Sequence, residues 1–176
     1  QEGKGKHRTN RTVIAGKNSL ENDFIRIEFH INGTFDLIDK IHNTTYRNQH
    51  LFRDGGDAGD TYNYSPPESD KLITNENLSA KIVVLDKGPI IGRFLIAVDM
   101  EIPAGLSDDG KTRSQNNKQL HIESKISLGC YSKTVAIHTK IINNADDHRF
   151  QVLFPCGTKS DFSFAEEQFG VIKRPN

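Results

Sequence analysis

Residues 54–67 hold the side chains best suited to chemistry in this chain of 176 residues. The segment reads Asp-Gly-Gly-Asp-Ala-Gly-Asp-Thr-Tyr-Asn-Tyr-Ser-Pro-Pro, and its glycines and prolines favour a loop. A carboxylate accepts hydrogen bonds from sugar hydroxyls, and a tyrosine ring offers a flat apolar face for a sugar ring. Asp57, Asp60, Tyr62 and Tyr64 are therefore candidate carbohydrate contacts.

The acidic and aromatic residues of this loop admit more than one interpretation. Glycoside cleavage uses two carboxyl groups across the scissile bond, and Asp57 with Asp60 could form such a pair. Aspartate and glycine also build ordinary turns, in which the carboxylate binds nearby backbone N–H groups. Tyr62 and Tyr64 would point the same way in an extended segment, or they could be partly buried loop anchors. Both the ligand-contact and the structural hypotheses remain open.

Other catalytic and metal-binding patterns are missing from the sequence. The seven histidines show no metal-ligand spacing, and no Gly-x-Ser-x-Gly elbow or phosphate-binding glycine loop occurs. His121 and His138 fall on the polar faces of two expected strands, which indicates solvated positions. Cys130 and Cys156 lack a Cys-x-x-Cys spacing, so we expect ordinary buried thiols in preference to a disulfide or a metal site. No cofactor is expected in this chain.

Composition narrows the class of protein. Lysine plus arginine balance aspartate plus glutamate at 23 each, and the pI is near 7.2, which does not suit a nucleic-acid-binding protein. The basic cluster within residues 4–11 is interpreted as a solvated tail. No apolar run reaches the roughly 18 residues of a membrane helix. A hydrophobic fraction of 35% allows a core, so the chain fits one domain or a piece of one.

Alternation of apolar and polar residues predicts β-strands along most of the chain. The clearest runs are residues 25–29, 94–102, 120–128 and 135–141. Turn signals separate the runs, at Asn32-Gly33, Lys87-Gly88-Pro89 and residues 129–132. Long strands joined by short turns form antiparallel meanders, so we predict an all-β antiparallel sandwich of nine to eleven strands.

Two segments interrupt this pattern. Residues 104–118 are polar and poor in apolar side chains, so we expect a long mobile loop there. Residues 164–169 are the only helix candidate, of one turn at most.

Several motifs resemble the β-domain of α-mannosidases of glycoside hydrolase family 38. The segment Gly-Asp-Ala-Gly-Asp-Thr-Tyr-Asn-Tyr-Ser-Pro-Pro is the most specific, and it is similar to the bacterial branch, which includes mannosylglycerate hydrolases. The resemblance extends over about residues 18–175. The other matching segments are Leu20–Ile27, Asn32–Lys40, His148–Pro155, Gln168–Ile172 and Arg174-Pro175.

This resemblance implies a fold and a context. In that family a galactose-mutarotase-like β-sandwich, or supersandwich, follows a catalytic barrel and a small helical bundle, and the barrel holds zinc and an aspartate nucleophile. The barrel's His-x-Asp motif is missing from this sequence. The resemblance therefore implies a truncated, non-catalytic sandwich over residues 18–176, with residues 1–17 as a linker or first edge strand.

Further expectations follow from the same resemblance. The parent enzyme would be a retaining hydrolase of α-mannosides, with zinc in its missing catalytic domain, and this chain alone would be inactive. The chain would brace the missing N-terminal barrel and supply part of the pocket rim. Only Asp57, Asp60, Tyr62 and Tyr64 carry over as substrate contacts. A cytoplasmic, bacterial location is expected, and exposed sheet edges could pair with a second copy.

Two other functions are considered. A free-standing carbohydrate-binding module would use Tyr62, Tyr64 and Tyr46 as its platform, although the absence of tryptophan disfavours strong binding. A stand-alone aldose epimerase would need a histidine acid and a carboxylate base near one sugar, and no such pair stands out.

Overall fold

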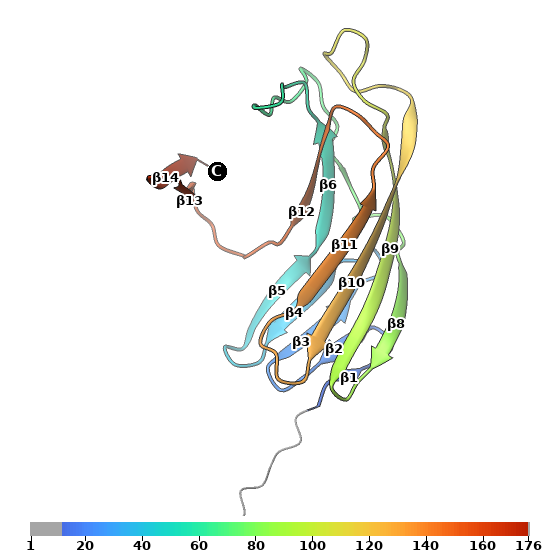
Figure 1. Ribbon diagram of the computed structural model, residues 1–176, viewed down its shortest axis with the longest axis vertical. Coiled ribbons are helices and arrows are strands. Elements are labelled where there is room, and N and C mark those ends of the chain that lie inside the picture. Colours follow the sequence, from blue (N-terminus) through green and yellow to red (C-terminus); the bar gives the residue numbers. More distant parts are fainter. Residues whose placement is uncertain (1–11, 176) are drawn as a thin grey trace, which may run out of the picture.

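The computed structural model describes residues 12–175, which form 14 strands in antiparallel sheets (Figure 1). The first sheet has the order β1-β2-β3-β4-β5. Its strands are β1 (Ile14–Ala15), β2 (Ser19–Glu21), β3 (Ile25–Phe29), β4 (Phe35–Asp39) and β5 (Thr44–Gln49). The all-β prediction is confirmed. No helix of the described residues is long and apolar enough to cross a membrane.

The second sheet packs face to face on the first and has the order β11-β10-β9-β8. Its strands are β8 (Lys81–Lys87), β9 (Ile91–Pro103), β10 (Asn117–Gly129) and β11 (Ala136–Ile142). A third sheet of order β12-β6-β7 extends the body, and a final hairpin stands apart from it (Figure 1). These strands are β6 (Leu51–Gly56), β7 (Ile73–Thr74), β12 (His148–Leu153), β13 (Phe162–Glu167) and β14 (Gly170–Pro175).

The core follows directly from the period-two pattern. β9 and β10 are 13 residues long each and pair along their whole length. Alternate side chains on both strands face the first sheet and are buried. On these two strands the buried residues are Phe94, Ile96, Val98, Met100, Ile102, Leu120, Ile122, Ile126 and Leu128.

The Asn32-Gly33 turn joins β3 to β4 as the sequence predicted. Gly33 has a φ of +85°, which is costly for any residue with a side chain. A Cβ at this position would also lie 2.9 Å from a methyl carbon of Ile96 in the opposite sheet. Asn32 Oδ1 accepts a hydrogen bond from the Thr34 N–H at 3.1 Å and closes the turn.

One local prediction was wrong, and another agrees with the structure in its position. Residues 162–175 form the β13–β14 hairpin, so the helical turn expected at 164–169 is replaced by a strand and a tight turn. The loop expected at 104–118 is present over residues 104–116, between β9 and β10, and its mobility stays a prediction. Short-range bonds organise it, including Ser107 N–H to the Thr112 carbonyl at 2.9 Å. Its Arg113 side chain is buried, with consequences for the site described below.

The two long edges of the sandwich differ. On one edge β1 lies against β8 and β9, where the Val13 N–H donates to the Pro89 carbonyl at 2.8 Å. On the other edge β5 and β11 are the outermost strands, and neither pairs with a further strand of residues 12–175. The sandwich is therefore closed along one side and open along the other.

Candidate functional site

The acidic loop follows β6 and lies at one end of the sandwich, at the top of Figure 1. Its backbone is tied back to the body, because the Asp57 N–H donates to the Asp147 carbonyl at 2.9 Å. The Ala58 N–H donates to the Ser65 carbonyl at 2.7 Å, which closes the loop on itself. A Cβ at Gly59 would lie 1.8 Å from the Asn63 carbonyl oxygen, so this compact path requires glycine there.

The carboxylates of Asp57 and Asp60 shape this loop. Asp57 Oδ1 accepts from the N–H groups of Gly59 at 2.9 Å and Ser65 at 3.2 Å. Asp60 Oδ1 accepts from the N–H groups of Tyr62 and Asn63, each at 2.8 Å. The hydrogen bond from the Tyr62 N–H is the main cause of a pKa of Asp60 below its usual value, and the bond from the Asn63 N–H lowers this pKa further. Both residues thus make the Asx-type bonds that the sequence left open.

The same two aspartates also border one shallow hollow of about 410 Å³. Asp57 and Asp60 lie beside Asp147 and His148 in its wall. The loop therefore presents carboxylates to an open depression, in a position where hydroxyl groups of a ligand could donate to them.

The two loop tyrosines have different surroundings. The loop is not a strand at these residues, so the extended geometry that would aim both rings one way is not realised. The Arg149 guanidinium lies 4.2 Å from the centre of the Tyr64 ring, a cation–π contact that holds this ring near β12. Tyr62 is 91% exposed and offers its whole ring to solvent.

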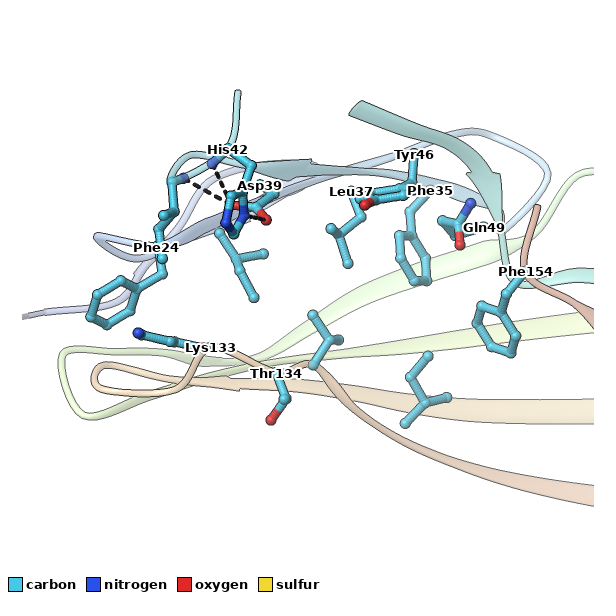
Figure 2. A pocket seen from close by; sticks show the side chains of 14 residues that line it. Phe24, Phe35, Leu37, Asp39, His42, Tyr46, Gln49, Lys133, Thr134 and Phe154 are labelled. Atoms are coloured by element: carbon cyan, nitrogen blue, oxygen red, sulfur yellow. Dashed lines mark hydrogen bonds and ion pairs between the residues drawn. The ribbon is translucent and has the colours of Figure 1, made fainter. Parts of the chain in front are cut away.

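Tyr46 belongs to a different part of the molecule. It lies on β5 and lines a groove between the two main sheets (Figure 2). The loop lies beyond the far end of β6, so the structure does not bring Tyr46 together with Tyr62 and Tyr64 (Figure 1). The three-tyrosine platform proposed for a free-standing binding module is not assembled.

A buried charge network supports the base of the loop. Asp54 is fully buried, and Arg113 Nη2 donates to its Oδ2 at 2.7 Å. His148 Nδ1 lies 2.5 Å from Asp54 Oδ1, and His148 Nε2 lies 3.1 Å from Asn143 Oδ1. The side chains of Arg113 and His148 are each only 5% exposed. Three distant segments therefore meet at one carboxylate directly below the acidic loop.

The glycines at the base of the loop let it lie close to this network. A Cβ at Gly56 would lie 2.9 Å from Pro67 Cγ and 3.3 Å from Arg113 Cγ. The Gly56 N–H also donates to Asp70 Oδ2 at 3.0 Å. The two ends of the loop are thus tied together over Arg113.

The sequence analysis missed Asp54, Arg113 and His148 as a group. One signal was available: alternation in β6 places Asp54 on the same face as Phe52, which is completely buried. A carboxylate on a buried face requires a charged or hydrogen-bonding partner.

Among residues 12–175 no three His, Cys, Asp or Glu side chains gather closely enough to hold a metal ion. Cys130 and Cys156 are free thiols; Cys130 is buried as expected, but Cys156 is exposed, contrary to prediction. β10 and β11 pair as anticipated, and His121 on β10 binds Asp99 at 2.6 Å. The Asp99 contact raises the pKa of His121.

Comparisons with known proteins agree with the fold. Residues 20–176 match the model of the glycosyl hydrolases family 38 C-terminal domain. A protein of Halalkalibacterium halodurans named as a mannosylglycerate hydrolase is 24% identical over 173 residues, covering 90% of this chain. The crystal structure of an alpha-mannosidase from Enterococcus faecalis superposes with a TM-score of 0.85 at 26% identity over the whole chain.

A further Enterococcus faecalis structure, of a protein in glycosyl hydrolase family 38, gives the same TM-score of 0.85 and the same 26% identity. The chain spans about a fifth of these proteins: 19% of the Halalkalibacterium protein and 21% and 22% of the two crystallised chains. The family match covers most of the sequence and agrees with the all-β architecture. This chain belongs to the glycosyl hydrolase family 38 C-terminal domain family.

Proposed function

We propose that this chain is the part of an α-mannosidase-type glycoside hydrolase that shapes the rim of the substrate pocket. The observation that carries the proposal is the acidic loop, which rests on a buried charge network and presents Tyr62, 91% exposed, to solvent. Asp57, Asp60, Tyr62 and Tyr64 contact the sugar in this account. The substrate is an α-mannoside, as the names of the similar proteins suggest.

The chemistry itself belongs to polypeptide outside these 176 residues. Retaining glycosidases need a nucleophile and an acid/base group flanking the bond, and the described residues offer no such buried pair facing a pocket. Zinc and the nucleophile reside in the catalytic barrel of the parent protein, which acts in the bacterial cytoplasm. The sandwich braces that barrel and brings the acidic loop to its pocket.

The first experiment assays this chain and the full-length parent with an aryl α-mannoside in the presence of zinc. The parent should hydrolyse the substrate, and the chain alone should not. Zinc-dependent turnover by the chain alone would overturn the assignment of the chemistry to another domain. An inactive but folded parent would overturn the proposed substrate class.

A second experiment tests the loop in the parent enzyme. Tyr62→Ala removes the most accessible ring, so kcat/KM should fall by about tenfold, equivalent to about 1.4 kcal/mol of lost transition-state binding. Tyr131→Ala is the matched control, because Tyr131 is also exposed but lies in the turn after β10. Equal kinetics for both variants and the wild type would contradict a role for the loop at the pocket.

A further inference from the structure

A second hollow, of about 690 Å³, lies between the segment that leads into β7 and the loop that joins β9 to β10. Its lining residues come from 69–73, from 112–115 and from the facing ends of β9 and β10. It shares no lining residue with the hollow that Asp57 and Asp60 border. We call it the Arg113 hollow, and its volume is in the range of pockets that take small molecules.

Arg113 brings unpaired hydrogen-bond donors to this hollow. Its Nη2 donates to Asp54 Oδ2 at 2.7 Å. Its Nε and Nη1 are buried as well, and neither has a hydrogen-bond partner within residues 12–175. A buried charged donor without an acceptor is costly, because it has lost its contact with water. An acceptor group bound in the hollow would therefore be stabilised by these N–H groups.

Asp70 brings an unpaired acceptor to the same place. Its Oδ2 accepts a hydrogen bond from the Gly56 N–H at 3.0 Å, whereas its Oδ1 is buried and has no partner in the described part of the chain. Arg113 also lies next to Gly56, since a Cβ there would be 3.3 Å from Arg113 Cγ. Three of the four buried side-chain atoms that lack a partner within residues 12–175 thus belong to these two residues of one hollow.

The combination of unpaired donors and an unpaired acceptor indicates the chemistry of the ligand. A hydroxyl group can accept from a guanidinium N–H and donate to a carboxylate through the same oxygen atom. An anion would satisfy Arg113 but would be repelled by the carboxylate of Asp70. The charged lining is balanced, with Asp70 and Glu101 against Lys71 and Arg113. These features favour a neutral ligand that carries several hydroxyl groups.

The apolar part of the lining narrows the ligand further. Leu72, Ile73 and Pro103 border the same hollow, and Leu72 is 56% exposed. A sugar ring has hydroxyl groups around its edge and C–H groups on its faces, so it uses polar and apolar lining together. Apolar walls with a few converging polar groups are the usual design of a small-molecule site.

We propose that the Arg113 hollow binds a neutral sugar ring. A hydroxyl group of the sugar accepts from Arg113 and donates to Asp70 Oδ1, and a C–H face of the ring packs on Leu72. The inference rests on the proposed function only for the choice of mannose as the probe. An inorganic anion held by Arg113 is the competing outcome.

Hydrogen exchange of the full-length protein tests the proposal, with mannose and sodium sulfate added in separate samples. Mannose should slow exchange in residues 69–73 and 112–115, and sulfate should not. No slowing at about 100 mM mannose, where a millimolar site would be filled, would overturn the proposal. Slowing by sulfate and not by mannose would overturn it in favour of an anion site. Residues 57–66 are read in the same samples, so failure of the acidic loop to bind is distinguishable from failure of this hollow.

Two variants then assign the binding to these side chains. Asp70→Asn keeps an acceptor for the Gly56 N–H but places an amide donor at the unpaired position, so the mannose concentration for half-maximal slowing should rise at least about tenfold. Leu72→Ala should raise it about threefold through lost apolar contact. Asp108→Asn is the matched control, because Asp108 is exposed in the same loop and does not line the hollow. An unchanged midpoint in Asp70→Asn, or an equal rise in Asp108→Asn, would contradict the assignment.

Discussion

The acidic loop and the groove between the two main sheets, which lies beside β5 and β11, differ in whether this chain supplies all of their packing partners. Below the loop, the buried carboxylate of Asp54 pairs with Arg113 and His148, which belong to the same chain. At the groove, apolar side chains and strand edges remain uncovered among the described residues. The contrast teaches that the loop should keep its shape in the isolated chain, because its support lies within the chain, whereas the groove stays open beside β5 and β11.

The strongest way to break this comparison is to remove the anchor of the loop. Asp54→Asn leaves Arg113 and His148 buried without a carboxylate, and we expect a loss of about 3–5 kcal/mol in the free energy of unfolding. Urea unfolding of the isolated chain measures it. Asp99→Asn is the control, because Asp99 pairs with His121 at the surface and should cost well under 1 kcal/mol. Similar losses for both variants would show that the network does not anchor the loop.

The second prediction concerns His50, whose ring lies 6.1 Å from that of Phe35 and 6.3 Å from that of Phe154, both in the groove wall. Burial lowers the pKa of His50 to about 4. Below pH 6.5 this histidine is protonated in the unfolded chain but stays neutral in the native chain until the pH nears 4. The free energy of unfolding should therefore fall between pH 6.5 and 4, by up to about 3 kcal/mol.

His50→Gln removes this proton linkage and serves as the matched comparison. Its free energy of unfolding should depend less steeply on pH between 6.5 and 4 than that of the wild type. His121 acts in the opposite direction, since its raised pKa favours the native state at low pH. Identical pH slopes for the wild type and His50→Gln would refute the buried neutral histidine.

Paired isoleucine substitutions sharpen the comparison at the groove. Ile126→Val removes a fully buried methylene and should cost about 1 kcal/mol. Ile137→Val, at the neighbouring position on β11, should cost less than half as much in the isolated chain because its side chain is partly exposed. Urea unfolding measures both values. A cost for Ile137→Val equal to that of Ile126→Val would mean that the groove is already covered.

The smallest effect is expected at the tip of the loop. Tyr62→Ala should change the stability of the isolated chain by less than about 0.5 kcal/mol, because the ring is almost fully exposed. Thermal unfolding monitored by circular dichroism is sufficient. A large loss would show that Tyr62 supports the fold, and its effect on catalysis could then not be read as substrate contact.

Much of this fold is predictable because period-two alternation reports burial directly. The long strands β9 and β10 and the Asn32-Gly33 hairpin follow from local sequence alone. The β13 strand does not, since the short run from Phe164 to Phe169 fits helix and strand equally until its pairing with residues 170–175 is known. Alternation of apolar and polar residues therefore identifies a strand only where the alternating run is long.

The exposed residues of the site could be predicted from the sequence, whereas the buried residues that support the loop could not. The residue types and spacing of Asp57 and Asp60 predict a loop, and both residues border one hollow in the structure. Arg113 lies in a polar segment and becomes buried only by meeting Asp54, 59 residues away in the sequence. No local pattern encodes such a long-range pairing of charges, so the anchor of the loop required coordinates.

Hydrogen exchange of the loop in the full-length protein tests the central claim most directly. The amides of Gly59, Tyr62 and Asn63 bind the two loop carboxylates, so their exchange reports on contacts at Asp57 and Asp60. The account predicts that saturating mannose slows exchange in residues 57–66 and leaves the turn at 129–132 unchanged. Unchanged exchange in residues 57–66 at saturation would contradict it.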